Sequence, residues 1–443
     1  MAMIATDNAH YADIASAIRA KNGGTDTYKP SEMAVAIKAI KTGPTPGEPL
    51  DPVEVYKYTR PSDWLPMPTP NDNEMYLLFH IPDGVSSLLA FTVTCIGNYT
   101  VALGTVRDGA FVQFSSASIA SKSKYEAELF ADDFGDLTST GMKQVMVKVS
   151  GADILTWEPS IHSKKLSPSH FAGWNIVDIS CRLPSGTGVQ CGETSDLALK
   201  NLVYFSWHGT NNATNMSNMF CNCHSLISIP YLDTASVTNM YNMFSNCYSL
   251  ISIPDLNTSM VTNMYNMFSY CYSLPSIPAL DTSSVTNMST MFICCYSLPS
   301  IPALDTSSVT LMNSMFKNCY SLTSIPALDT SSVTVMADMF RSCYSVISIP
   351  PLDTSSATSM SNMFLDCYYL SDVRLAPTVS GWPGCAITLQ DASLGHTAIV
   401  ALFDSLPTIT SAKAITLTGN PGASELTDAE KAIATDKGWT LTL

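Results

Sequence analysis

A 24-residue period constrains this chain more than any other feature of its sequence. Seven cysteines recur at that interval from Cys223 to Cys367, and methionines, Met-Phe pairs and prolines keep the same register without insertion or deletion. One unit reads LDTSSVTNMSNMFSNCYSLxSIPx. A period between about 20 and 50 residues is typical of a solenoid, because each unit leaves an apolar surface that only the next unit covers. We therefore predict a solenoid of seven coils over residues 213–370.

The pattern within one unit predicts how each coil runs. Apolar residues three apart, such as Phe244, Cys247 and Leu250, indicate a coil that turns inward repeatedly. The Ser-x-Leu-x-Ser-Ile-Pro stretch predicts a short strand that ends at proline, which has no N–H to donate. Asp-Thr-Ser-Ser predicts a turn, and Thr-Asn-Met-x-x-Met-Phe predicts one helical turn capped by Thr or Asn. Coils stacked about 4.8 Å apart would align equivalent residues in ladders.

We expect two of these ladders to form the core. Parallel side chains strung along a line do not converge on one ion at about 2.3 Å, as zinc ligands must, so buried reduced thiols are favoured over a metal site or disulfides. Cys221 and Cys294 fall outside the register, and Cys294 is expected to be exposed. The core ladders are Cys223, Cys247, Cys271, Cys295, Cys319, Cys343 and Cys367, and Phe220, Phe244, Phe268, Phe292, Phe316, Phe340 and Phe364.

Two further ladders are candidates for the surface. The tyrosines should stack into an aromatic stripe that either receives the faces of sugar rings or only covers the edge of the core, with its hydroxyls in water. Repeated aspartates, such as Asp281 and Asp305, could bind calcium to relieve their repulsion, but an Asp-Thr-Ser turn satisfies the same oxygens, and we expect no metal or cofactor. The candidate ligand-contact stripe is Tyr248, Tyr272, Tyr296, Tyr320, Tyr344 and Tyr368.

Charge and motif content exclude several classes of function. The chain carries a net charge of −15 with only 13% charged residues, and the basic residues of the seven coils are Lys317 and Arg341. Nucleic acid is therefore not an expected partner, and no apolar run approaches the roughly 18–20 residues that insert in a membrane. Neither a histidine metal motif, a G-x-S-x-G motif nor a glycine-rich phosphate loop is present. We expect no catalytic residues, although an enzyme within residues 56–200 is the open alternative.

The regions that flank the repeats differ from them in pattern. Before the coils, apolar residues at helical spacing give way to a Pro-rich stretch and then to short alternating strands typical of a β-sandwich. After them, helical spacing at 396–406 and 426–438 alternates with strands, and Thr427 to Glu430 is a capping box. The fold class is mainly β with short helices. The predicted regions are a helical hairpin for attachment or oligomerisation (1–42), a Pro-rich linker (43–55), a β-sandwich (56–160), an N-terminal cap with degenerate repeats (161–212), the coils (213–370), and longer strand–helix repeats with a C-terminal cap (371–443).

Three stretches resemble known modules. LDTSSVTNMSTMFICCYSLPSIP at 280–302 is similar to the BspA-like leucine-rich repeats of bacterial and phage surface proteins, a resemblance that extends over 202–370. RPSDWLPMP at 60–68 and LLAFTVTCIGNYTV at 88–101 resemble an immunoglobulin-like (PKD-like) module, and 13–40 resembles a helical hairpin near the N-termini of phage tail and baseplate proteins. The resemblance implies a leucine-rich-repeat-like solenoid that serves adhesion without catalysis.

These resemblances lead to an expected function. The stretch 1–21 has no basic region followed by an apolar core, so we expect synthesis in a host cytoplasm without a signal peptide. We predict a phage tail-fibre or baseplate protein of the virion that recognises a host-surface glycan or protein receptor. It would contact other tail proteins through its N-terminal region and form a homo-oligomer, a trimer. The alternatives are a bacterial cell-surface adhesin of the same repeat family and a non-catalytic scaffold.

Overall fold

The structure is a computed structural model, and the residues it describes belong to one of two compact units. The units are Met1–Arg60 and Pro61–Leu443. The hairpin predicted at 1–42 and the linker predicted at 43–55 lie outside the described residues. Within the part of the chain that is described, no helix has the length and apolarity to cross a membrane. The described residues are 61–82, 86–139, 141–159, 176–189, 191–192, 199–229, 231–376 and 386–443.

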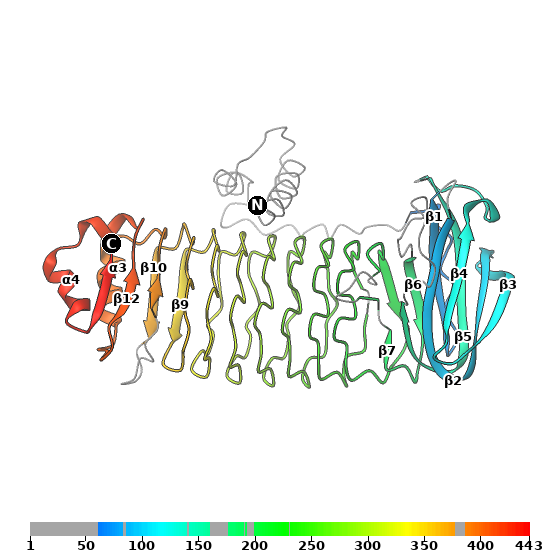
Figure 1. The fold of residues 1–443 in the computed structure, drawn as a ribbon, viewed down its shortest axis with the longest axis horizontal. Helices are drawn as coiled ribbons and strands as arrows, with labels where there is room; N and C mark the ends of the chain where they lie inside the picture. The colour runs from blue at the N-terminus through cyan, green and yellow to red at the C-terminus, as the bar shows by residue number, and fades with distance from the viewer. Residues whose placement is uncertain are drawn as a thin grey trace, which may run out of the picture. The chain divides into compact units, whose positions relative to one another are not determined.

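The predicted fold class is confirmed: the chain is mainly β, with a solenoid of stacked 24-residue coils. A β-sheet lies at the start of the coils and a strand–helix segment at their end (Figure 1). One continuous core of buried side chains runs from Met75 in the sheet, through all the coils, to Trp439 in the last strand. The described residues include two α-helices, both in the C-terminal segment.

An eight-stranded sheet precedes the coils. Its strands run in the order β3-β2-β5-β1-β6-β8, with β4 paired to β2 and β7 paired to β5. The pairs among β1 to β6 are antiparallel, whereas β6 pairs with β8 in parallel. The strands are β1 (Glu74–Pro82), β2 (Ser86–Arg107), β3 (Ala110–Ala120), β4 (Lys124–Phe130), β5 (Met142–Pro159), β6 (Ile176–Arg182), β7 (Gly188–Val189) and β8 (Tyr204–Trp207), with a short 3-10 helix, η1 (Ala131–Asp133), after β4.

The immunoglobulin-like sandwich predicted for 56–160 is not confirmed, because these strands belong to a single hydrogen-bonded sheet. Where the sequence predicted short strands, residues 86–107 form the one long strand β2. Its pairing with β5 shifts register around Ile96, where Gly97 has a φ of 70°. Such a bulge bends a strand without ending it. The sheet also includes β6 and β8, so the predicted sandwich and the predicted N-terminal cap share it.

The sheet passes directly into the solenoid. Tyr204 of β8 forms a parallel bridge with Ser228 of the first coil, and Ser228 bridges Ser252 of the second. Gly192 covers the first coil by donating its amide to the Met219 carbonyl at 2.7 Å. A side chain at position 192 would meet the backbone nitrogen of Cys221 at 2.0 Å, so only glycine fits there.

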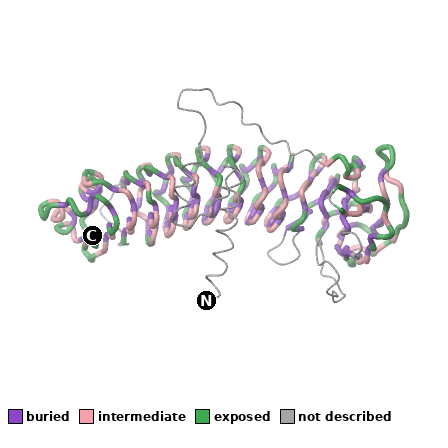
Figure 2. The backbone as a smooth tube through the Cα atoms, turned by 90° about the horizontal axis from the view of Figure 1, so that it is seen from above, coloured by how far each residue is buried: buried purple, intermediate pink, exposed green. Residues whose placement is uncertain are grey.

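Each coil buries the positions that the sequence predicted to be inward, and the same burial pattern recurs from coil to coil (Figure 2). The predicted helical turn at Thr-Asn-Met-x-x-Met-Phe is wrong, because this segment is a series of tight turns. Two residues per coil, four apart, have left-handed backbone, for example Asn218 (φ 58°) and Asn222 (φ 62°). Asn239, the predicted helix cap, instead caps a turn. Its side-chain oxygen accepts a hydrogen bond from the amide of Tyr241 at 3.1 Å.

The coils are joined by several recurring rows of backbone hydrogen bonds rather than by long strands. A bridge links Asn215 to Asn239, and equivalent bridges continue without a gap to Ser359. Beside this row, the amide and the hydroxyl of Thr262 both donate to the Thr238 carbonyl, at 3.0 and 3.3 Å, and later coils repeat the pair. The strand predicted at Ser-x-Leu-x-Ser-Ile-Pro becomes regular only at β9 (Ser348–Asp353), which pairs in parallel with β10 (Asp372–Ala376).

The C-terminal segment confirms the predicted strand–helix repeats. Three parallel strands form a small sheet, and α3 packs against α4 (Figure 1). Thr427 and Glu430 make the predicted capping box at the start of α4. The elements are β11 (Ile387–Thr388), α3 (His396–Ser405), β12 (Lys413–Thr416), the 3-10 helix η2 (Pro421–Glu425), α4 (Asp428–Thr435) and β13 (Trp439–Thr442).

Candidate ligand-contact surface of the solenoid

The phenylalanine ladder forms the centre of every coil, as predicted. Neighbouring rings from Phe220 to Phe364 are stacked, with centroids 5.5 to 5.8 Å apart and interplanar angles of 4° to 10°. Phe205 of β8 extends the ladder with an edge-on contact to Phe220 at 5.0 Å. The stacked rings fix the register of one coil on the next, and this register aligns the surface rows.

The cysteine ladder consists of free buried thiols among the described residues. The Cys295 thiol donates to the carbonyl of Phe268 in the preceding coil at 3.1 Å, and the other ladder cysteines from Cys247 to Cys367 repeat this bond. Burial raises the pKa of these thiols, in Cys367 to about 12, so they stay protonated and unreactive. Each cysteine thus adds a weak inter-coil hydrogen bond that alanine could not make.

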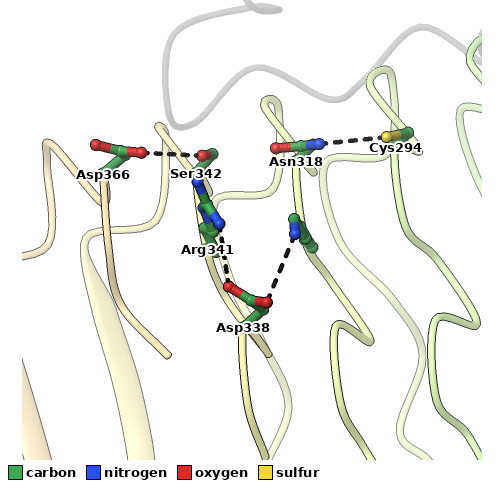
Figure 3. A network of polar contacts seen from close by, with 7 residues as sticks. Cys294, Asn318, Asp338, Arg341, Ser342 and Asp366 are labelled. Carbon is green, nitrogen blue, oxygen red and sulfur yellow. Dashed lines mark hydrogen bonds and ion pairs between the residues drawn. The ribbon is translucent and has the colours of Figure 1, made fainter. Parts of the chain in front are cut away.

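The expectation that Cys294 is exposed is wrong, since it is 4% exposed. It occupies one of the two left-handed positions (φ 61°), which turns its side chain along the solenoid toward the next coil. There the Asn318 amide donates to the Cys294 sulfur at 3.4 Å (Figure 3). Cys221 is also buried.

The tyrosine stripe stacks as predicted. Centroids of neighbouring rings from Tyr248 to Tyr368 lie 4.6 to 5.1 Å apart, with interplanar angles of 2° to 21°. His224, 24 residues before Tyr248, extends the stack at 4.3 Å, and its place in the period was the signal that the sequence offered. The structure therefore brings all six predicted residues into one row and adds a seventh.

The stacking determines which parts of the tyrosine rings a ligand could contact. Because each ring covers its neighbours, the faces of Tyr272 to Tyr344 are occupied by protein, and Tyr320 is only 9% exposed. Tyr368, the last ring, is 42% exposed. Burial raises the pKa of Tyr248, Tyr272 and Tyr296, so their hydroxyls are neutral donors and acceptors at physiological pH. Contact with a ligand would use ring edges and hydroxyls.

The carboxylates of the aspartate ladder accept hydrogen bonds within their own turns. The Asp281 carboxylate accepts from the amide and the hydroxyl of Ser283 at 3.1 and 2.7 Å, and Asp305 and Asp329 do the same. These bonds lower the pKa of Asp281 and Asp305. Asn257 makes the same turn with Ser259, so the turn does not need the charge. No cluster of three metal-ligating side chains occurs among residues that the structure describes.

The two cations of the coils share one carboxylate. Lys317 and Arg341 are equivalent residues of neighbouring coils, and their Nζ and Nη1 atoms lie 3.6 and 3.4 Å from the two oxygens of Asp338 (Figure 3). Ser342 contacts Asp366 at 3.5 Å in the same region. Exposed pairs of this kind contribute about 0–1 kcal/mol. The Asp338 carboxylate offsets one of the two positive charges, and the coils as a whole hold more aspartates than basic residues.

Stacked coils with buried leucines at recurring positions, such as Leu250 and Leu256, define a repeat protein of leucine-rich-repeat-like form. A family model described as "Mycoplasma protein of unknown function, DUF285" matches residues 198–298 and 273–373, which are the coils and their borders. This match supports the repeat class that the sequence resemblance indicated. A search of curated proteins found no match.

Comparison with solved structures returns matches of low similarity. One solved structure, described as "Crystal structure of TLR13-ssRNA13 complex", aligns with a TM-score of 0.27 and 15% identity over 55% of this chain. The alignment spans only 36% of that chain. A likeness this slight carries no argument about ligands or partners.

Proposed function

We propose that this protein is an adhesive component of a phage tail fibre or baseplate, and that its solenoid contacts the host surface without catalysing a reaction. The supporting observation is the surface of the coils, which repeats hydroxyl, amide and ring-edge groups in straight rows. Its basic residues are few, Lys317 and Arg341, and both contact Asp338. Such a surface favours adhesion through many hydrogen bonds over electrostatic steering. The receptor would be a glycan or a protein of the host surface.

The phage assignment rests on the resemblance of residues 13–40 to a hairpin of tail and baseplate proteins. In this proposal, residues 1–42 attach the chain to other tail proteins, and three copies assemble so that weak contacts combine into avidity. Antibodies against the chain should then label purified virions at the tail in electron micrographs. Label on the surface of uninfected bacterial cells would instead support the adhesin, and label on neither would support the scaffold.

Host contact is tested with the full chain, because β1 pairs with both β5 and β6 and a cut near residue 160 would divide the sheet. The labelled full chain should bind cells of a susceptible strain and compete with virion adsorption. The triple variant Tyr296→Phe, Tyr320→Phe, Tyr344→Phe keeps the stack but removes three hydroxyls, and should bind less.

The chain supplies a matched control for the tyrosine variants. Tyr241 and Tyr265 form a separate stack at 5.3 Å elsewhere on the coil surface. The double variant Tyr241→Phe, Tyr265→Phe should bind cells as the parent does. If the triple variant binds as well as the double variant and the parent, the tyrosine stripe is not part of the proposed contact. If the parent itself does not bind, the adhesive function is refuted.

A further inference from the structure

The N-terminal sheet ends in a long strand whose outer edge is unprotected. β3 stands at one end of the strand order and lies on the side of the sheet away from the coils (Figure 1). Among the described strands, β3 pairs with β2 alone. Sheets usually protect such an edge with charged residues, prolines or short strands, because its outward N–H and C=O groups can pair with another chain. The eleven residues Ala110–Ala120 include neither a charged residue nor a proline.

The neighbouring strand β4 shows what a protected edge looks like in this sheet. It continues the same edge, because it pairs with the earlier half of β2. β4 carries Lys124, Glu126 and Glu128 within seven residues. In β3, by contrast, every residue is exposed or half-buried without a charge, and the Phe114 side chain is 56% exposed. The lack of protection is therefore specific to β3.

The pairing of β3 with β2 shows which of its backbone groups face outward. The strand is regular only after its bulge, since Phe114 has no partner in β2 and regular pairing runs from Ser115 to Ala120. The Ser121 amide donates to the Gly97 carbonyl of β2 at 3.2 Å. Along an antiparallel pair, residues bonded to the neighbouring strand alternate with residues whose N–H and C=O groups point away from it. The outward groups are therefore those of Ser116, Ser118 and Ala120.

We propose that β3 pairs in antiparallel fashion with β3 of a second copy of this chain, with Ser118 on the two-fold axis. In this register outward groups meet outward groups, because Ser118 lies opposite Ser118 and Ser116 opposite Ala120. The two sheets then form one continuous sheet. The same register brings Phe114 beside Lys122 of the other copy, and a lysine ammonium is attracted to the face of an aromatic ring.

Two physical arguments favour a second copy as the occupant of this edge. Pairing about a two-fold axis uses the same edge on both chains, so it closes and leaves no further edge for fibre growth. The chain has a net charge of −15, so two copies repel one another overall and can approach where acidic residues are absent. β3 is such a place. The inference goes beyond the proposed function, because a two-fold contact is distinct from a three-copy assembly and would link two such assemblies.

Cysteine cross-linking of the full chain tests the register. Opposed residues of a hydrogen-bonded antiparallel pair have Cα atoms about 5.5 Å apart, which is within the range of a disulfide. Ser118→Cys should therefore form a disulfide-linked pair of chains on mild oxidation. Ser115→Cys is the matched control, because in this register the two copies of residue 115 lie six residues apart along the strands, about 20 Å. The parent, whose described cysteines are buried, gives the background.

Association in solution, measured by sedimentation equilibrium, is the second readout. Ser118→Lys places like charges directly opposite each other and should raise the dissociation constant of the pair by about fivefold or more. Phe114→Ser should also weaken the pair but keep the parent's melting temperature, because Phe114 is largely exposed in the single chain. Ser276→Lys adds the same charge to an exposed serine of the coils and should associate as the parent does.

Three results would overturn the inference. They are the absence of a cross-link in Ser118→Cys, a cross-link in Ser115→Cys that forms as readily, and association that neither Ser118→Lys nor Phe114→Ser weakens. Neither readout involves host cells, so the outcome is independent of the test of adhesion.

Discussion

Removal of one ring from the phenylalanine ladder is the most direct test of how the coils are held together. Phe292 is fully buried and lies between Phe268 and Phe316, with centroids 5.8 and 5.7 Å away. Phe→Ala changes in packed cores cost about 3–5 kcal/mol, and aromatic pairs add about 0.5–1.5 kcal/mol each beyond their buried area. Because two pairs are lost, we expect Phe292→Ala to fall at the upper end, at about 4–5 kcal/mol.

The terminal ring offers a graded comparison. Among the described rings of the ladder, Phe364 stacks on Phe340 alone, so Phe364→Ala should cost about 1 kcal/mol less than Phe292→Ala. Hydrogen exchange followed by mass spectrometry measures the loss locally, which suits a repeat array without a single two-state transition. Protection should fall in the coils from Phe268 to Phe316 and persist in the β1–β8 sheet and in α3 and α4. A loss below about 1 kcal/mol, or a uniform loss over the chain, would refute the ladder as the main inter-coil contact.

Four further outcomes are expected. Alkylation in denaturant without reductant should modify all thirteen cysteines, whereas blocked cysteines would contradict the free thiols. Thr306→Val should cost about 1–3 kcal/mol in denaturant unfolding, because the buried Thr306 hydroxyl donates to the Asp329 carbonyl at 2.8 Å and valine leaves that acceptor unpaired; an unchanged midpoint would contradict this. Thr290→Asn should stabilise the folded protein by about 1 kcal/mol, because Thr290 has a left-handed φ of 56° that a β-branched residue adopts at a cost. Asn occupies the equivalent position 266 of the preceding coil. A lower melting temperature of the variant would show that the threonine is not strained. The pKa of Asp281 and of Asp305 is lowered from 3.8, so their carboxylates stabilise the fold above that pH, and this contribution is lost as pH falls through the lowered pKa. The melting temperature of the double variant Asp281→Asn, Asp305→Asn should therefore fall less steeply in acid than that of the parent. An identical fall would refute this expectation.

The parts of the fold that were predictable are those that neighbouring residues determine. Inward positions such as Phe244, Cys247 and Leu250 are apolar in every coil, and burial follows apolarity. The capping box of Thr427 and Glu430 is a contact between residues three apart, and it forms as expected. The tyrosine row followed from the period alone.

The errors arose where long-range pairing or backbone conformation decides. The helical turn was predicted from the spacing of Met240, Met243 and Phe244, but a series of tight turns places the same three residues inward. Asparagine at the left-handed positions of the first two coils, 218 and 222 and then 242 and 246, was the overlooked signal, since it tolerates that conformation better than most residues. The bulge at Gly97 and the pairing of β9 with β10 depend on which distant strands meet, and no local pattern specifies that.

The uniform spacing of the coils has a consequence for how such a protein can change. The amide of Phe244 donates to Met267 of the next coil, and the same bond recurs from Phe220 to Phe340 at 2.9 to 3.0 Å. A coil therefore presents one surface to the coil before it and the complementary surface to the coil after it, whatever its place in the series. Duplication or loss of a whole 24-residue unit would preserve the recurring backbone bonds at the new junction and change the reach of the solenoid by about 4.8 Å per coil. The gene can in this way adjust length by recombination between its own repeats, while the sheet and the C-terminal cap remain untouched.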